Sequence, residues 1–188
     1  MSSSACLVLS PPEYEKPEQT APMLVAGEAF PDLRQTIYVY DDTPWVEFGG
    51  AVLSEDAGDP VQFAIFLDYG QRNAAGRPYR NVVYPFEPVS PGTLADGPRT
   101  FSSKLWYPSV QTVSYGCHTA TLMASHAFDP GVCPASPDDA SYLVWQVIRC
   151  PSSNECNDTC EPPACDPVEG CASCSTPEPD ASAERGAQ

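Results

Sequence analysis

Apolar and polar side chains alternate along the middle of the chain. The clearest stretch is "VQFAIFLDY", residues 61–69, in which Val61, Phe63 and Ile65 share one face. A repeat of two residues is that of a β-strand, because successive side chains of a strand point to opposite faces. We therefore predict a strand here, with this apolar face against a core.

Six further short stretches carry a similar pattern, each bounded by Gly, Pro or Asp residues that are typical of turns. They are residues 35–42, 45–54, 80–86, 101–107, 116–128 and 141–150. No stretch of the chain shows a convincing pattern of an amphipathic helix. About seven short strands at this spacing predict an all-β fold, an antiparallel sandwich of two sheets.

Composition divides the 188 residues into three zones. Residues 1–34 are rich in proline, which locks the backbone and favours extended geometry, so we predict an irregular tether. Residues 35–150 hold nearly all the large apolar side chains and form the predicted sandwich. Residues 151–188 hold five cysteines, six prolines and no aromatic residue, too little apolar surface to offset their ordering entropy. We predict a disulfide-stapled tail to about residue 174 and disorder beyond it.

The formal net charge of -16 bears on the choice of partners. It disfavours nucleic acid and anionic lipid surfaces, which repel an acidic chain. The nine cysteines favour an oxidising compartment, whereas the opening "MSSSACLVL" contains no signal peptide. We expect that the printed sequence begins inside or just after an export signal. The rival hypothesis is a reducing compartment with metal-bound thiolates.

Cys6 stands more than a hundred residues before the next cysteine and follows the small residues of "SSSA". This segment resembles the cleavage box of bacterial lipoproteins, in which a cysteine after a small residue becomes the lipidated N-terminus. The Pro-rich acidic stretch that follows is similar to the tethers of such lipoproteins. The resemblance implies lipidation of Cys6 and stable anchoring through several acyl chains.

The last two predicted strands form a hairpin if residues 127–140 are its loop. A register that places His126 opposite Ser141 also places Cys117 opposite Cys150. Directly opposed residues of antiparallel strands are close enough for a disulfide, so we predict a Cys117–Cys150 bridge; a slip of one residue would remove the match. The same register gathers an apolar series on the core face: Ala120, Leu122, Ala124, Leu143, Trp145 and Val147.

Six cysteines then remain without an assigned partner: Cys133, Cys156, Cys160, Cys165, Cys171 and Cys174. They allow fifteen pairings, among which the sequence does not choose. In the simplest arrangement, the loop residue Cys133 docks the stapled tail to one end of the sandwich.

The segment "YGCHT" places Tyr115 two residues before Cys117. It resembles the tyrosine corner of immunoglobulin-like and fibronectin-type sandwiches, which implies an immunoglobulin-like β-sandwich. The early strand "VEFGGAVL" has no cysteine, so the usual bridge between the sheets is absent, and the tryptophan expected on the following strand is replaced by Phe63 or Ile65. The resemblance therefore extends to the fold and to no function.

His118 and His126 are the two histidines of the chain. Eight residues of strand separate them by roughly 27 Å, so they cannot bind one metal together, and we interpret both as ordinary surface or core residues. Cys117 is adjacent to His118, but neighbours in a strand point to opposite faces, which disfavours a Cys–His catalytic pair. No phosphate loop, nucleophile elbow or paired-carboxylate motif occurs. We therefore predict no catalytic residue and no cofactor.

Metal sites are not predicted either. The tail contains one short C-x2-C pair, Cys171 and Cys174, without a second pair or a nearby histidine, so disulfides are favoured over zinc. Asn157 begins an N-glycosylation sequon, which carries little weight in a chain that resembles bacterial lipoproteins. Four acidic loop residues lack the regular ligand spacing of a calcium loop: Asp56, Asp59, Asp138 and Asp139.

The sequence suggests three functions, the last of them disfavoured. The first is a non-catalytic, exported lipoprotein of the bacterial cell envelope, periplasmic or outer-membrane, which presents an immunoglobulin-like sandwich as a binding or structural module. Its partner would be a protein or another envelope component, with membrane contact only through the N-terminal lipid. The second is a secreted, disulfide-rich inhibitor or ligand whose tail is the active part. The third, an enzyme, is disfavoured by the absent motifs.

Overall fold

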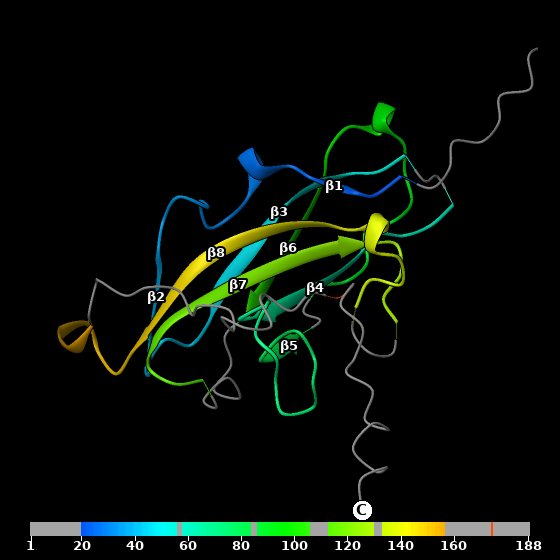
Figure 1. Cartoon of the computed structure of the whole chain (residues 1–188). Helices are drawn as coiled ribbons and strands as arrows, with labels where there is room; N and C mark the ends of the chain where they lie inside the picture. The colour runs from blue at the N-terminus through cyan, green and yellow to red at the C-terminus, as the bar shows by residue number, and fades with distance from the viewer. Residues whose placement is uncertain are drawn as a thin grey trace, which may run out of the picture.

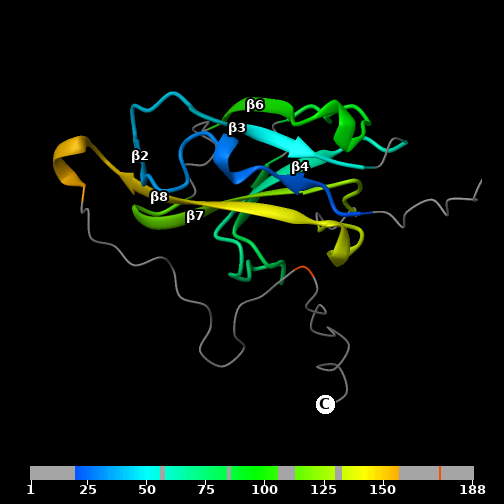
Figure 2. The ribbon, with the colours of Figure 1, turned by 90° about the horizontal axis from the view of Figure 1, so that it is seen from above.

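The computed structural model describes residues 20–55, 58–83, 86–105, 113–129, 133–156 and 174. None of these residues lies in an α-helix, and their strands form two sheets that face each other as two layers (Figures 1 and 2). The all-β prediction is therefore confirmed. Four short 3-10 turns also occur among the described residues: η1 (Ala26–Glu28), η2 (Leu94–Asp96), η4 (Pro137–Asp139) and η5 (Ser153–Glu155).

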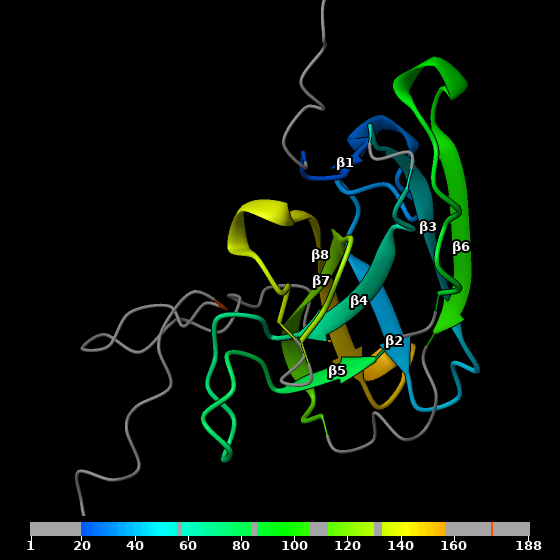
Figure 3. The same cartoon turned by 90° about the vertical axis from the view of Figure 1, so that its right-hand side faces the viewer.

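The smaller sheet has three strands in the order β1-β3-β6, all antiparallel. These are β1 (Met23–Leu24), β3 (Val46–Leu53) and β6 (Arg99–Leu105). The larger sheet has five strands in the order β2-β8-β7-β4-β5. They are β2 (Ile37–Tyr40), β4 (Gln62–Leu67), β5 (Asn81–Val83), β7 (Gly116–Ser125) and β8 (Ser141–Cys150). Figure 3 shows β3 and β6 on one side of the molecule and β7 and β8 on the other.

Two details differ from the predicted antiparallel sandwich of about seven strands. The described residues contain eight strands, because β1 is too short to show any alternation in the sequence. In addition, β2 pairs with β8 in parallel, Ile37 opposite Val147, at one edge of the larger sheet. Strand direction at an edge depends on where the chain crosses between the sheets, which the alternation of side chains does not reveal.

The sandwich includes residues that composition assigned to the tether over residues 1–34. Met23 pairs with Leu53 of β3, and the buried Leu24 belongs to the core. Phe30 and Gly49 exchange two backbone hydrogen bonds, of 2.9 and 2.8 Å. The sheets thus begin before the boundary expected at residue 35. Residues 1–19 lie outside the described part of the chain.

The core fills the space between the two sheets and centres on Trp145 of β8. Its ring meets that of Phe48 from β3 edge-on, with ring centroids 5.1 Å apart and an interplanar angle of 77°. Its indole N–H donates to the carbonyl oxygen of Pro31 at 2.6 Å. One side chain therefore joins both sheets and the segment that leads into β2. Aromatic edge-to-face pairs of this kind add to the stabilisation from area burial.

The observed β7–β8 register differs by two residues from the one predicted. Ala124, rather than His126, lies opposite Ser141, so that Cys117 faces Ile148 and not Cys150. The core face survives this shift because side chains repeat every two residues along a strand. Leu122 accordingly lies opposite Leu143, and both are buried in the core.

Leu122 provides a test of this core. It is fully buried, at 0 % exposure, whereas Leu94 of η2 is 48 % exposed. We expect Leu122→Ala to lower the free energy of unfolding by about 2–5 kcal/mol, because it removes apolar contacts and leaves a cavity. The same substitution at Leu94 should cost about 0.5 kcal/mol or less. Denaturant unfolding of both oxidised variants measures the difference, and equal losses would contradict the described packing.

Candidate functional site

Two disulfides are formed between described cysteines. Cys133 bonds Cys174, with Cα atoms 5.4 Å apart, and Cys150 bonds Cys156, with Cα atoms 5.1 Å apart. Cys117 is also disulfide-bonded, but the predicted Cys117–Cys150 bridge is wrong. The two-residue shift in register separates these positions, and η5 brings Cys156 back to the end of β8.

Several predicted positions lie outside the described residues, namely Cys6, Asp56, Asn157, Cys160, Cys165 and Cys171. The lipidation of Cys6 and the pairing of the remaining tail cysteines therefore stay predictions.

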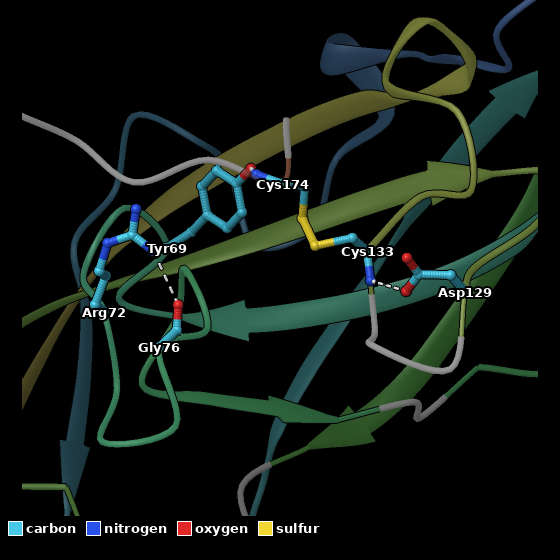
Figure 4. Close-up of a disulfide and its surroundings, with 6 residues drawn as sticks. All are labelled: Tyr69, Arg72, Gly76, Asp129, Cys133 and Cys174. Atoms are coloured by element: carbon cyan, nitrogen blue, oxygen red, sulfur yellow. Dashed lines mark hydrogen bonds between the residues drawn. A yellow bond between two sulfur atoms is a disulfide. The ribbon is translucent and has the colours of Figure 1, made fainter. Parts of the chain in front are cut away.

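The Cys133–Cys174 disulfide joins the β7–β8 loop to the tail, and we call it the clasp (Figure 4). Asp129 supports the loop side: its backbone N–H donates to the Cys133 carbonyl at 2.8 Å, and its carboxylate accepts the Cys133 N–H at 3.0 Å. On the tail side, the Cys174 N–H donates to the Tyr69 hydroxyl at 2.8 Å. Cys174 is thus held both to the loop and to the end of β4.

The clasp borders a groove of about 440 Å³ on the outer face of β7 and β8. Its walls are apolar or uncharged: Tyr69, Thr119, Thr121, Met123, Pro134, Pro137, Ala140, Tyr142, Val144 and Cys174. Tyr142 and Val144 are 66 % and 43 % exposed. Outward positions of two neighbouring strands line up in this way because alternate residues of each strand face the same side. The groove is therefore one concave surface that the described residues offer to a ligand.

Tyr69 gives this groove its anchored polar group. Its ring stands edge-on to Phe66, with ring centroids 5.6 Å apart, inside a small apolar cluster on the outer face that includes Met123. Burial raises the pKa of the Tyr69 hydroxyl, so the phenol stays neutral and can donate its O–H while it accepts from Cys174.

Asp68, one residue earlier, shapes the end of β4. It is buried with a φ of +52°, a backbone conformation that Asp tolerates better than most residues. Its carboxylate accepts from the Thr119 N–H at 3.1 Å, lies 2.8 Å from His118 Nδ1 and pairs with Arg80 at 3.1 Å. These partners compensate the buried charge and fix the turn that leads into Tyr69.

His118 is a buried core residue in this network. Its Nε2 lies 2.9 Å from the carbonyl oxygen of Ser114, and its Nδ1 lies against the Asp68 carboxylate. Both partners are acceptors only, so His118 makes both hydrogen bonds when each ring nitrogen carries a proton. These two contacts tie β4 to the segment before β7.

His126 lies just beyond the end of β7 in a second, separate network. Its Nδ1 is 2.7 Å from Asp139 Oδ1, and its Nε2 is 3.0 Å from Ser54 Oγ. The other Asp139 oxygen accepts from the His126 backbone N–H at 2.9 Å and from the Ser125 hydroxyl at 3.0 Å. Asp139 is thus a buried, hydrogen-bonded group. The chain positions of these residues gave no signal, since Ser54 and Asp139 lie 72 and 13 residues from His126.

Tyr115 occupies the position of the proposed tyrosine corner but makes a different contact. Its hydroxyl donates to the Asp41 carboxylate at 2.7 Å, and Arg149 lies over its ring and 3.2 Å from Asp41. The hydrogen bond from Tyr115, together with Arg149, lowers the pKa of Asp41. The same bond raises the pKa of Tyr115. This cluster links the end of β2 to the start of β7 and the end of β8.

Within the described ranges, no group of three or more His, Cys, Asp or Glu side chains is arranged to hold a metal ion, and no described helix has the length and apolar character needed to cross a membrane. Comparison with protein-family models, with curated proteins and with solved structures finds no match for this chain.

Proposed function

We propose that this protein is an exported, disulfide-stabilised module of the cell envelope that acts by binding a partner in the groove beside the clasp. The single observation that carries the proposal is the groove itself, whose apolar and aromatic walls include the exposed Tyr142 and Val144. Ligand sites are usually concave and mainly apolar, with a few placed polar groups. Tyr69 and the two threonines of β7 supply such groups here.

Charge narrows the class of partner. None of the described residues that line the groove is charged, and the whole chain carries a formal charge of -16. An anionic surface would be repelled at long range without gaining a salt bridge in the groove. The partner is therefore an uncharged or cationic envelope component, a protein in the first instance, that contributes apolar or aromatic groups to the contact.

We also propose that the two sheets form an immunoglobulin-like sandwich. Two facing sheets support an immunoglobulin-like sandwich, and Tyr115 matches the tyrosine corner in its sequence position but not in its hydrogen bond. The disulfides at Cys133 and Cys150 support an oxidising compartment. Lipidation at Cys6, supported by the sequence "SSSAC", would place the sandwich at a membrane surface at the end of its Pro-rich tether.

One observation favours the second hypothesis, a secreted inhibitor or ligand whose tail is the active part. The clasp holds a tail residue, Cys174, against the groove. In that case the tail would be presented to a partner by the sandwich, and no lipid anchor would be needed. The two hypotheses therefore differ in which surface binds and in whether Cys6 is modified.

The groove hypothesis predicts a selective loss of binding at Tyr142. We expect Tyr142→Asp to weaken capture of an envelope partner at least about tenfold, because a charge placed among apolar walls is not solvated in the complex. Leu94→Asp is the matched control, since Leu94 is also exposed but lies on η2, next to the three-stranded sheet. Both variants and the unchanged chain would be used to capture material from envelope extracts. Quantitative mass spectrometry with stable-isotope labels then compares the amount of each captured protein. Equal recovery with Tyr142→Asp would contradict the proposal.

Anchoring is tested separately. When the chain is produced behind its own upstream coding sequence, we expect the N-terminal peptide of the membrane-extracted protein to begin at Cys6 and to carry acyl chains. Cys6→Ser should move the protein from the membrane to the soluble fraction. Intact-mass measurement decides, and a mature protein with unmodified Cys6 would favour the secreted inhibitor.

A further inference from the structure

A serine, a histidine and an aspartate meet at the end of the sandwich where β3 and β7 finish. Ser54 follows β3 of the three-stranded sheet, His126 follows β7 of the five-stranded sheet, and Asp139 belongs to η4. Ser54 Oγ lies 3.0 Å from His126 Nε2, and His126 Nδ1 lies 2.7 Å from Asp139 Oδ1. These are the contacts of a nucleophile, its general base and the group that orients the base.

The hydrogen-bond partners determine where the protons are. The Asp139 carboxylate only accepts, so His126 carries a proton on Nδ1 and donates it to Asp139. In the neutral ring this leaves a lone pair on Nε2, to which the Ser54 hydroxyl donates. The serine proton is therefore already directed at a base that can remove it.

His118 shows why this arrangement is more than a buried His–Asp pair. It also contacts an aspartate through Nδ1, but its Nε2 lies against the Ser114 carbonyl oxygen, which has no proton to give. The Nε2 of His118 therefore faces a carbonyl oxygen and not a hydroxyl that it could deprotonate. His126 differs in that its Nε2 lies 3.0 Å from a hydroxyl oxygen, that of Ser54.

The base is held firmly. Asp139 Oδ2 accepts from the His126 backbone N–H at 2.9 Å and from the Ser125 hydroxyl at 3.0 Å, which fixes the carboxylate relative to the ring. Ser54, His126 and Asp139 are 3 %, 5 % and 9 % exposed. Low exposure strengthens the electrostatic interaction between the three groups, and it restricts any reagent that reaches Ser54 to small, uncharged molecules.

We propose that Ser54 is a nucleophile for acyl transfer from small, uncharged carboxylic esters. In this step the Ser54 oxygen bonds to the ester carbonyl carbon while His126 Nε2 takes the hydroxyl proton. The carbon–oxygen bond to the leaving alcohol then breaks, and the alcohol departs with that proton. The products are an acylated Ser54 and a free alcohol. This activity goes beyond the binding role proposed for the groove, and it revises the sequence-based prediction of no catalytic residue.

The test uses the folded, oxidised full chain and a small serine-directed reagent, phenylmethylsulfonyl fluoride, together with p-nitrophenyl acetate as ester. We expect one sulfonyl adduct, located on Ser54 by peptide mass spectrometry, and ester cleavage that the adduct abolishes. His126→Gln should slow adduct formation at least about 100-fold, because the general base is lost. Ser102→Ala, at an exposed serine of β6, is the control and should leave the rate unchanged.

Identification of the adduct in the unchanged chain does not depend on whether any variant folds. Circular dichroism of His126→Gln separates loss of the base from loss of the fold. Absence of an adduct on Ser54 under native conditions would overturn the proposal, as would adduct formation at an equal rate in a folded His126→Gln variant. In either case the three residues would serve only to tie the two sheets together.

Discussion

The pairing of β7 with β8 is the constraint on which the rest of this structure depends. Each strand is ten residues long, and the register places Leu122 opposite Leu143. Because side chains alternate, the paired strands turn Leu122 and Trp145 toward the core and Met123, Tyr142 and Val144 toward the outer groove. The same register sets the two ends of the hairpin, where Cys150 meets Cys156 and where the loop that holds Cys133 begins.

Buried polar groups define the points at which the strands stop. A buried carboxylate is costly unless it is paired and hydrogen-bonded, so Asp68 and Asp139 each accept several such bonds. Asp68 ends β4 and directs Tyr69 toward the groove. Asp139 holds His126 beyond the end of β7 and, with Ser54, links the two sheets. The proposed binding surface and the proposed nucleophile therefore both follow from side chains that fix strand ends.

Alternation in the sequence was sufficient to predict the all-β class and the core faces of residues 61–65 and 120–124, because burial on one face imposes a period of two. It could not reveal β1, which has two residues, or the parallel entry of β2 at a sheet edge. The disulfide prediction failed because two registers two residues apart leave the same faces buried, and only the full fold distinguishes them. The Ser54–His126–Asp139 contacts could not be predicted either, because they depend on the full fold. They form where loops from both sheets converge.

Disulfide mapping of the native protein tests the central claim most directly, because the bridges report the register of β7 and β8 and the position of the clasp. Proteolysis without reduction, at a pH that suppresses thiol exchange, would be followed by mass spectrometry of the linked peptides. The account predicts linked peptides that contain Cys133 with Cys174 and Cys150 with Cys156. A peptide pair that joins Cys117 to Cys150 would contradict the register of β7 and β8.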